Sequence, residues 1–210
     1  MTNKNIAKTA ILVSGGGTNL QAIIDAKKSG KIPNAELSLV VSNNPSAYAI
    51  TRAQNAGIPV EVVTKKEFSS KEDFEKKIIS VLDDNKIDFI VLAGFMSILS
   101  EDFVKHYERR IINVHPSLIP SFCGQGFYGL RVHEAALAYG VKVTGATVHF
   151  VNEIPDGGEI ILQKSVSIQK NDTPEILQKR VMEQAEWKIL PKAVNLVAKE
   201  IVRKRKAEVK

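Results

Sequence analysis

The sequence predicts a single-domain α/β fold, in which a mostly parallel sheet with a mixed edge carries helices on both faces. Short continuous apolar segments alternate with helical patterns through the first half of the chain, and two adjacent strand patterns follow later. Continuous apolar segments are typical of strands buried on both faces, and strands that alternate with helices over short links form parallel sheets with right-handed crossovers. The chain has 210 residues, of which 44% are hydrophobic, so it can bury one sizeable core.

Strands and helices are expected to alternate up to about residue 140. The continuous apolar segments predict strands at 9–13, 37–41, 60–63, 87–93 and 111–114. The first three helices follow from apolar residues at helical spacing, in segments that begin near Leu20, Ala47 and Phe74. Two further helices are expected at 101–110 and 132–139.

The mixed edge of the sheet is predicted by two neighbouring segments. Residues 141–151 alternate in polarity, and residues 159–168 are expected to pair with them through the turn at Asp156-Gly157-Gly158. A final helix is expected from Pro174 to about residue 205, with a kink at Pro191.

One domain is expected over residues 1–210, because no linker or composition shift divides the chain. Its ordered core is expected at about 9–205, followed by a basic tail at 206–210.

Composition and charge exclude several classes of protein. We expect a cytoplasmic protein, because residues 1–10 lack the apolar core of a signal peptide and no apolar segment is long enough to cross a bilayer. The net charge is +6, of which residues 199–210 carry +4, so the rest of the chain is only weakly basic. No nucleic-acid motif is present, and we expect neither nucleic acid nor a membrane as a partner. The single cysteine, Cys123, excludes an internal disulfide and a cysteine-based zinc site. The chain is expected to be a monomer or a homodimer.

Asn113, His115 and Asp156 point most directly to chemistry. The first two lie in the segment N-V-H-P-S-L-I-P at 113–120, and Asp156 opens the sequence D-G-G. An amide can donate a hydrogen bond to the oxyanion of a tetrahedral intermediate, and an imidazole can donate a second and exchange protons near neutral pH. A carboxylate can orient that imidazole and favour its charged form. The set suits metal-free transfer of a one-carbon acyl unit to an amine; the alternative is an ordinary strand end, loop and Asp-Gly turn.

The segment S-G-G-G-T-N at 14–19 joins the first predicted strand to the first predicted helix. Glycines let the backbone approach a ligand, and free N–H groups at a helix start attract phosphate. The Gly-Lys-Ser/Thr ending of a Walker loop is absent, and Leu20 stands where the dinucleotide fingerprint requires glycine. A phosphomonoester is therefore the favoured ligand, and a tight turn with a helix cap is the alternative.

Four segments together resemble the phosphoribosylglycinamide formyltransferase family. They are S-G-G-G-T-N-L-Q-A-I-I (14–24), L-A-G-F-M-S-I-L (92–99), N-V-H-P-S-L-I-P (113–120) and G-A-T-V-H-F-V (145–151), and D-G-G (156–158) follows them. The resemblance extends over about residues 10–191. It implies a Rossmann-like formyltransferase fold and transfer of the formyl group of 10-formyltetrahydrofolate to the amino group of glycinamide ribonucleotide, in de novo purine biosynthesis, without a metal.

The resemblance also implies which residues act. Asn113 and His115 would stabilise the oxyanion, and Asp156 would raise the pKa of His115 and help relay protons. The residues implied in binding the ribonucleotide are Gly16, Gly17, Thr18, Asn19 and Glu186. Those implied in binding the folate are Lys71, Met96, Ser97, Ile98, Leu99 and Asn113. Glu186 would bind the attacking amine or the ribose hydroxyls, the backbone of 96–99 would pair with the pterin, and Lys71 would meet the glutamate of the folate.

The sequence departs from the family pattern at two places. Ser97 stands where the family often has arginine, and the segment 121–132 is longer than the usual loop. The longer loop suits either a mobile lid over the folate or an ordinary surface loop. His149 is expected to be a hydrogen-bonded structural residue, and His133 is a weaker candidate for the site.

Three other functions share part of this evidence. Methionyl-tRNA formyltransferase and formyltetrahydrofolate deformylase use the same trio, but they usually carry a further domain, and the glycine loop favours a nucleotide acceptor over tRNA or water. A non-catalytic nucleotide-binding module would keep the glycine loop without needing Asn113, His115 and Asp156.

Overall fold

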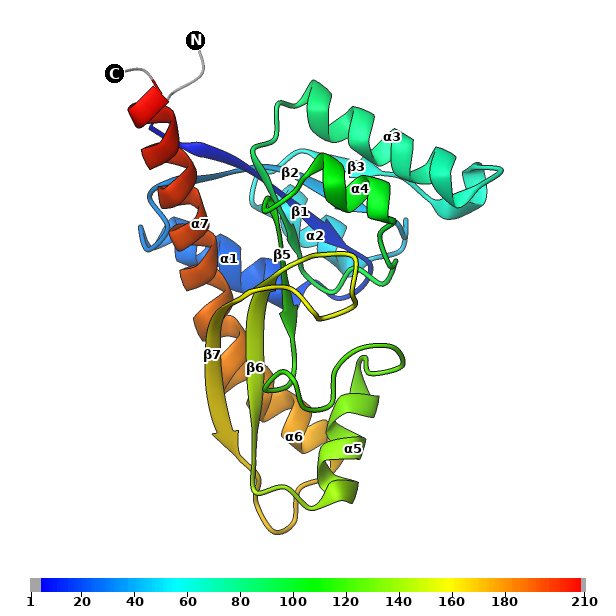
Figure 1. Ribbon diagram of the computed structural model, residues 1–210, viewed down its shortest axis with the longest axis vertical. Coiled ribbons are helices and arrows are strands. Elements are labelled where there is room, and N and C mark those ends of the chain that lie inside the picture. Colours follow the sequence, from blue (N-terminus) through cyan, green and yellow to red (C-terminus); the bar gives the residue numbers. More distant parts are fainter. Residues whose placement is uncertain (1–4, 209–210) are drawn as a thin grey trace.

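The computed structural model describes residues 5–208, which form one sheet with helices on both of its faces (Figure 1). The strands are β1 (Ala7–Val13), β2 (Ala35–Ser42), β3 (Val60–Val62), β4 (Phe89–Leu92), β5 (Ile111–His115), β6 (Val143–Phe150) and β7 (Ile160–Ser167). They lie in the order β3-β2-β1-β4-β5-β6-β7. Neighbours are parallel from β3 to β5, whereas β6 is antiparallel to both β5 and β7. The predicted mostly parallel sheet with a mixed edge is confirmed.

The helices follow the predicted order. They are α1 (Thr18–Lys28), α2 (Tyr48–Asn55), α3 (Lys71–Asp84), α4 (Glu101–His106), α5 (Leu130–Tyr139), α6 (Pro174–Val181) and α7 (Trp187–Glu208), with a short 3-10 helix at Lys65–Glu67. The helix predicted at 101–110 ends earlier, at His106, because Tyr107 leaves the helical conformation with a φ of −114° and a ψ of 37°. Arg109 then takes a positive φ of 53° in the turn that leads into β5.

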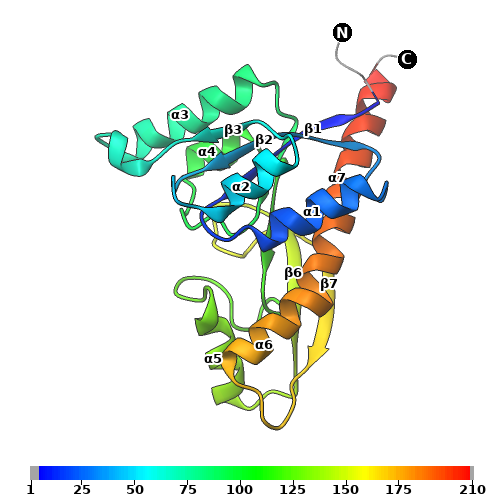
Figure 2. The ribbon, with the colours of Figure 1, turned by 180° about the vertical axis from the view of Figure 1, so that it is seen from behind.

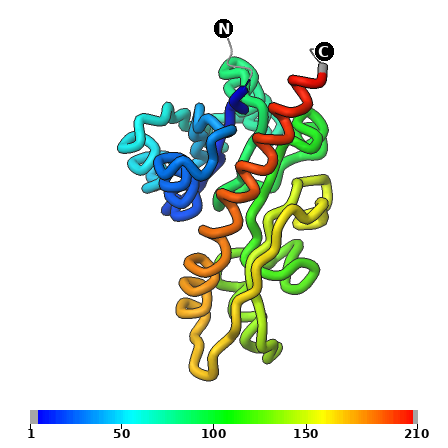
Figure 3. Tube along the Cα trace, turned by 90° about the vertical axis from the view of Figure 1, so that its left-hand side faces the viewer, coloured from blue at the N-terminus to red at the C-terminus, as the bar shows by residue number. Residues whose placement is uncertain are grey.

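The side chains of β1 alternate between two hydrophobic cores, one on each face of the sheet. In β1, Ile11 and Val13 belong to the core beneath α1, α2 and α7, whereas Ala10 and Leu12 belong to the core beneath α3 and α4. Figure 1 shows α3 and α4 in front of the upper strands, and Figure 2 shows α1 and α2 in front of the opposite face. The side view in Figure 3 shows the two layers on either side of the sheet.

The last helical segment contains an irregularity that the sequence did not predict. The chain forms a π-helical turn at Met182–Glu186, between α6 and α7. The helix α7 continues through Pro191, which lies inside it as its fifth residue, and the kink at Pro191 stays a prediction. π turns often occur at functional sites, and this one carries Glu186.

The predicted basic tail is partly helical, because α7 continues to Glu208. Arg205 anchors this end: it donates to the carboxylate of Asp88 and to the carbonyl of Ile6. Residues 209–210 of that tail lie outside the described residues. None of the helices in the described part of the chain is long and apolar enough to cross a membrane.

Candidate active site

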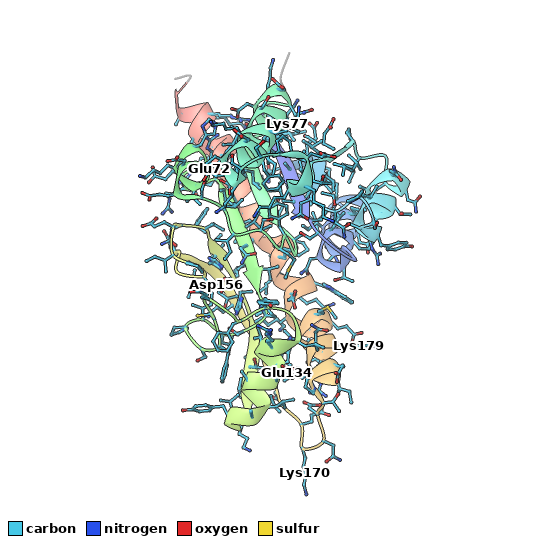
Figure 4. All side chains as sticks on the ribbon, turned by 90° about the vertical axis from the view of Figure 1, so that its right-hand side faces the viewer. Glu72, Lys77, Glu134, Asp156, Lys170 and Lys179 are labelled. Atoms are coloured by element: carbon cyan, nitrogen blue, oxygen red, sulfur yellow. The ribbon has the colours of Figure 1, made fainter. Side chains whose placement is uncertain are left out.

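Asn113 and His115 project from the face of β5 that lies away from the larger core. Their neighbours Ile112 and Val114 belong to the core beneath α1 and α7, and side chains alternate along a strand. In Figure 1 the segment between β6 and β7 crosses in front of β5, below α3 and α4. This segment carries Asp156, which Figure 4 labels near the middle of the molecule.

The three predicted catalytic side chains meet on this face. Nδ1 of His115 lies 3.4 Å from Oδ2 of Asp156, and Nδ2 of Asn113 lies 3.5 Å from Oδ1 of the same carboxylate. A tight turn follows Asp156 and keeps this segment close to the end of β6. In this turn the backbone of Gly158 lies so near the carbonyl oxygen of Phe150 that an added Cβ would be 1.8 Å from that oxygen, so only glycine fits there. The structure therefore brings together residues that are far apart in the sequence.

His149 also belongs to this cluster, although the sequence predicted only a structural role for it. Its Nε2 lies 3.3 Å from Nδ2 of Asn113 and 3.5 Å from Oδ1 of Asp156. Its Nδ1 lies 2.8 Å from the carbonyl oxygen of Phe150, to which it can donate. His149 is the cross-strand partner of Asn113 in the β5–β6 pair. The register of the β5–β6 pair brings these two residues together, and local sequence patterns do not determine that register.

The long loop at 121–132 contacts two members of the trio. Nε2 of His115 lies 2.9 Å from the carbonyl oxygen of Phe122, and the N–H of Gly124 donates to Oδ2 of Asp156 at 2.9 Å. Ring contacts of Phe122 with Phe127 and Tyr139 hold the loop against itself and against α5. The loop is therefore part of the site and is not an ordinary surface loop, whereas its opening as a lid stays a prediction.

His115 is buried and Asn113 and Asp156 are partly buried, and burial sets the charge of His115. Burial lowers the pKa of His115 below its usual value; the negative charge of Asp156 and the hydrogen bond to the Phe122 carbonyl oppose this without reversing it. The sequence analysis expected Asp156 to raise the pKa of His115. Asp156 does act in that direction, but the loss of hydration is the stronger effect, and His115 is mostly neutral at pH 7.

Asp156 remains ionised despite its partial burial. Burial alone would raise the pKa of Asp156, but its contacts with His149 and His115 and the N–H of Gly124 together hold this pKa below its usual value. The site therefore combines a neutral imidazole with a carboxylate at neutral pH.

The glycine loop lies between β1 and α1, where α2 presses against it. Gly17 caps α1 with a φ of 70°, and a Cβ added there would lie 2.7 Å from the Cβ of Ala49 in α2. Only glycine combines that conformation with so close an approach. Gly15 and Gly16 are exposed, so the backbone of the loop is open to a ligand.

Two of the predicted substrate-binding residues contact each other directly. Nδ2 of Asn19 donates to Oε2 of Glu186 at 2.7 Å, across 167 positions of sequence. Glu186 is only 6% exposed; burial raises its pKa, and the bond from Asn19 opposes that rise. Thr18 joins the same contact region, since its Oγ1 lies 3.9 Å from Sδ of Met182 in the π turn. The π turn thus lies against the start of α1.

The segment predicted to contact the folate, 96–99, follows β4 and reaches the glycine loop. The N–H of Met96 donates to Oγ of Ser14 at 2.8 Å, so this amide is already engaged. Nδ2 of Asn43 donates to Oγ of Ser97 at 3.0 Å. The side chains of Met96 and Ile98 are 61% and 67% exposed, and they supply the apolar surface that a flat heterocycle would cover.

Lys71, the predicted contact of the folate glutamate, is held by a neighbouring acid. It is the first residue of α3, and its Nζ lies 3.6 Å from Oε1 of Glu75. Glu75 is buried and accepts the N–H of Ser100 at 3.0 Å. Lys71 is therefore tied to the residue that follows the 96–99 segment.

A groove of about 1210 Å³ lies between α1 and α7, and Thr18, Arg52 and Trp187 contribute to its lining. It borders the glycine loop but is not lined by the catalytic trio. Among the residues that the structure describes, no cluster of three or more His, Cys, Asp or Glu side chains is arranged to hold a metal ion.

Known proteins share this sequence and fold. Residues 7–194 match the family described as formyl transferase. The phosphoribosylglycinamide formyltransferase of Haemophilus influenzae is 44% identical over 88% of this chain and 84% of its own length. The solved structure of phosphoribosylglycinamide formyltransferase from Brucella melitensis is 40% identical, with a TM-score of 0.84 over 92% of this chain and 96% of that one. Glycinamide ribonucleotide transformylase 1 from Symbiobacterium toebii is 36% identical, with a TM-score of 0.87 over 93% of this chain and 89% of that one.

The chain therefore belongs to the formyl transferase family. Within that family it groups with the phosphoribosylglycinamide formyltransferases, as the resemblance predicted. It also matches the trifunctional purine biosynthetic protein adenosine-3 of Gallus gallus at 45% identity, but it spans only 19% of that protein's length.

A buried histidine beside the site should make stability depend on pH. His133 of α5 is fully buried, its ring nitrogens have no hydrogen-bond partner in the described part of the chain, and burial, with a smaller effect of His115, lowers its pKa to about 4. Between pH 6.5 and 4 the unfolded chain binds a proton that the folded chain does not, so stability falls as the pH falls. At pH 5 this loss should be roughly 2 kcal/mol.

Urea unfolding at pH 7 and pH 5 measures this loss, with His133→Leu as the comparison. The variant lacks the titrating ring and should lose about 2 kcal/mol less than the parent protein between the two pH values. An equal loss in both proteins would show that His133 does not titrate in this way.

Proposed function

We propose that this chain transfers the formyl group of 10-formyltetrahydrofolate to the amino group of glycinamide ribonucleotide. The observation that carries the proposal is the meeting of Asn113, His115 and Asp156 on the open face of β5. The glycine loop and the 96–99 segment adjoin each other through the Ser14–Met96 hydrogen bond, so a nucleotide site and a folate site would share one border. The names of the relatives support the same reaction.

Attack of the amine on the formyl carbon produces a tetrahedral intermediate with a negatively charged oxygen. Nδ2 of Asn113 carries two hydrogens, which face Nε2 of His149 at 3.3 Å and Oδ1 of Asp156 at 3.5 Å. The amide donates to this oxygen once the longer contact, with Asp156, is exchanged for it. Nε2–H of His115 supplies a second donor once it leaves the carbonyl of Phe122. Preorganised donors of this kind each contribute about 10²–10³-fold to kcat.

Proton transfer completes the reaction, because the attacking amine must lose a proton and the departing nitrogen N10 of the folate must gain one. Asp156 is ionised and lies next to Nδ1 of His115, so it stabilises the imidazolium that forms when His115 takes up a proton. The two side chains therefore act as the relay.

The ribonucleotide is held by its two ends. Its phosphate binds the backbone of Gly16 and Gly17 with the side chain of Thr18, and the Asn19–Glu186 pair binds the ribose hydroxyls or the amine. The folate lies along 96–99 with its glutamate towards Lys71. The protein acts in the cytoplasm as a monomer or a homodimer, with small molecules as its substrates and no nucleic acid as a partner.

The first test is incubation with 10-formyltetrahydrofolate in the presence and absence of glycinamide ribonucleotide, with the deformylated folate followed by absorbance. Turnover should depend on the amine. Formate release without the amine would identify a deformylase instead, and no turnover under either condition would favour a non-catalytic nucleotide-binding module.

His115→Ala should lower kcat by about 10²–10³-fold, because it removes one oxyanion donor and the proton relay. Equilibrium dialysis should show that both ligands still bind. Turnover within a few-fold of the parent protein would exclude His115 from the mechanism.

Inorganic phosphate should compete with the ribonucleotide and not with the folate, because the glycine loop recognises the phosphate group alone. Steady-state inhibition at varied concentrations of each substrate distinguishes the two patterns. Competition against the folate would contradict the assignment of the loop.

A further inference from the structure

The segment 44–52, which contains most of α2, binds three successive carbonyl groups of the glycine loop. Nδ2 of Asn44 donates to the carbonyl of Ser14 at 3.1 Å, and the N–H of Ala49 donates to that of Gly15 at 3.1 Å. Nε of Arg52 donates to the carbonyl of Gly16 at 2.8 Å. Figure 2 shows α2 lying beside α1, on the face of the sheet where the loop ends.

This arrangement fixes the direction of the N–H groups of the loop. In a trans peptide unit the C=O and the following N–H point in opposite directions. The carbonyls of Gly15 and Gly16 face α2, so the N–H groups of Gly16 and Gly17 point away from α2. Successive N–H groups aimed to one side form an anion-binding concavity.

Arg52 is the residue of α2 that brings charge to this arrangement. Its NH1 donates to Oε1 of Gln21 at 3.0 Å, and its guanidinium lies 4.9 Å from the centre of the Tyr48 ring. These contacts and the bond to Gly16 fix the guanidinium from three sides. In the described part of the chain no acidic side chain lies within salt-bridge distance of Arg52. Its positive charge is therefore not neutralised locally.

We propose that Arg52 is a positioning residue for the phosphate-binding loop. It holds the Gly16–Gly17 peptide unit with its N–H towards the ligand, and it places a fixed positive charge behind the loop. The phosphate dianion benefits from both effects. Arg52 donates to the carbonyl of Gly16 and so polarises the peptide unit whose N–H, that of Gly17, donates to the phosphate. The inference rests on the proposed function, since it assumes that the loop binds the phosphate of the ribonucleotide.

Arg52→Gln and Arg52→Lys test the proposal, with Arg203→Gln as the matched control. Arg203 is an exposed arginine of α7, so its replacement removes the same charge at a distance from the loop. Arg52→Gln should raise both the KM for glycinamide ribonucleotide and the Ki of inorganic phosphate about tenfold, since it removes a charged hydrogen-bond donor. The KM for the folate and the kcat should stay within about twofold of the values for the control. The Tm should stay within about 2 °C of that of the control.

Arg52→Lys separates geometry from charge. Lysine keeps the charge but lacks the planar fork that reaches both Gly16 and Gln21, so the Ki of phosphate should still rise, by about threefold or more. A Ki equal to that of the parent protein in the lysine variant would overturn the positioning role. An unchanged Ki of phosphate in Arg52→Gln would also overturn it. The same holds if Arg52→Gln lowers the kcat, raises both KM values by a similar factor and lowers the Tm, because these changes together indicate a general loss of structure.

Phosphate binding can also be followed without catalysis, by the NMR shifts of the Gly16 and Gly17 amides during titration with inorganic phosphate. These shifts should saturate in the parent protein and require about tenfold more phosphate in Arg52→Gln. If Arg52→Gln binds phosphate more weakly as expected but the parent protein shows no transfer to glycinamide ribonucleotide, the proposed function fails and the role of Arg52 stands. If it turns over the ribonucleotide and Arg52→Gln binds phosphate normally, the role of Arg52 fails alone.

Discussion

The antiparallel pairing of β6 with β5 is the constraint on which the candidate site depends. In this register Asn113 faces His149 and His115 faces Thr147, so the polar residues of both strands gather on one face. A shift of one residue would send the side chains of β6 to the other face. The same pairing fixes where β6 ends, and therefore where the segment that carries Asp156 folds back over β5.

The loop at 121–132 supplies hydrogen-bond partners to two of the site's side chains. The ring N–H of His115 donates to the carbonyl of Phe122, and the carboxylate of Asp156 accepts from the N–H of Gly124. A buried donor or acceptor without a partner costs about 1–3 kcal/mol, so these contacts stabilise the site. In the proposed mechanism the formyl oxygen replaces the loop carbonyl as the partner of His115, which would couple the position of the loop to substrate binding.

The sequence predicted all seven strands, the trio and the glycine loop, because each depends on local patterns: apolar segments, turn residues and motif order. It did not predict the contacts of His149 with Asn113 and Asp156, since the pairing of β5 with β6 depends on contacts across the whole sheet. It did not predict the π turn at Met182–Glu186, because neither apolar spacing nor Pro191 signals such a turn. The downward direction of the His115 pKa was also missed, because burial cannot be read from residue types alone.

The π turn has a consequence for how this chain tolerates change in length. It accommodates one residue more than a regular helix would over the same rise, and α7 continues from it for 22 residues. Loss of one residue there would return the segment to a regular α-helix and leave α7 nearly in phase with α6, so the buried side chains of Leu190 and Val194 would stay in the core. The bulged turn that presents Glu186 to Asn19 would be lost. A single codon deletion would thus disrupt the Asn19–Glu186 contact without displacing the helix that supports the sheet.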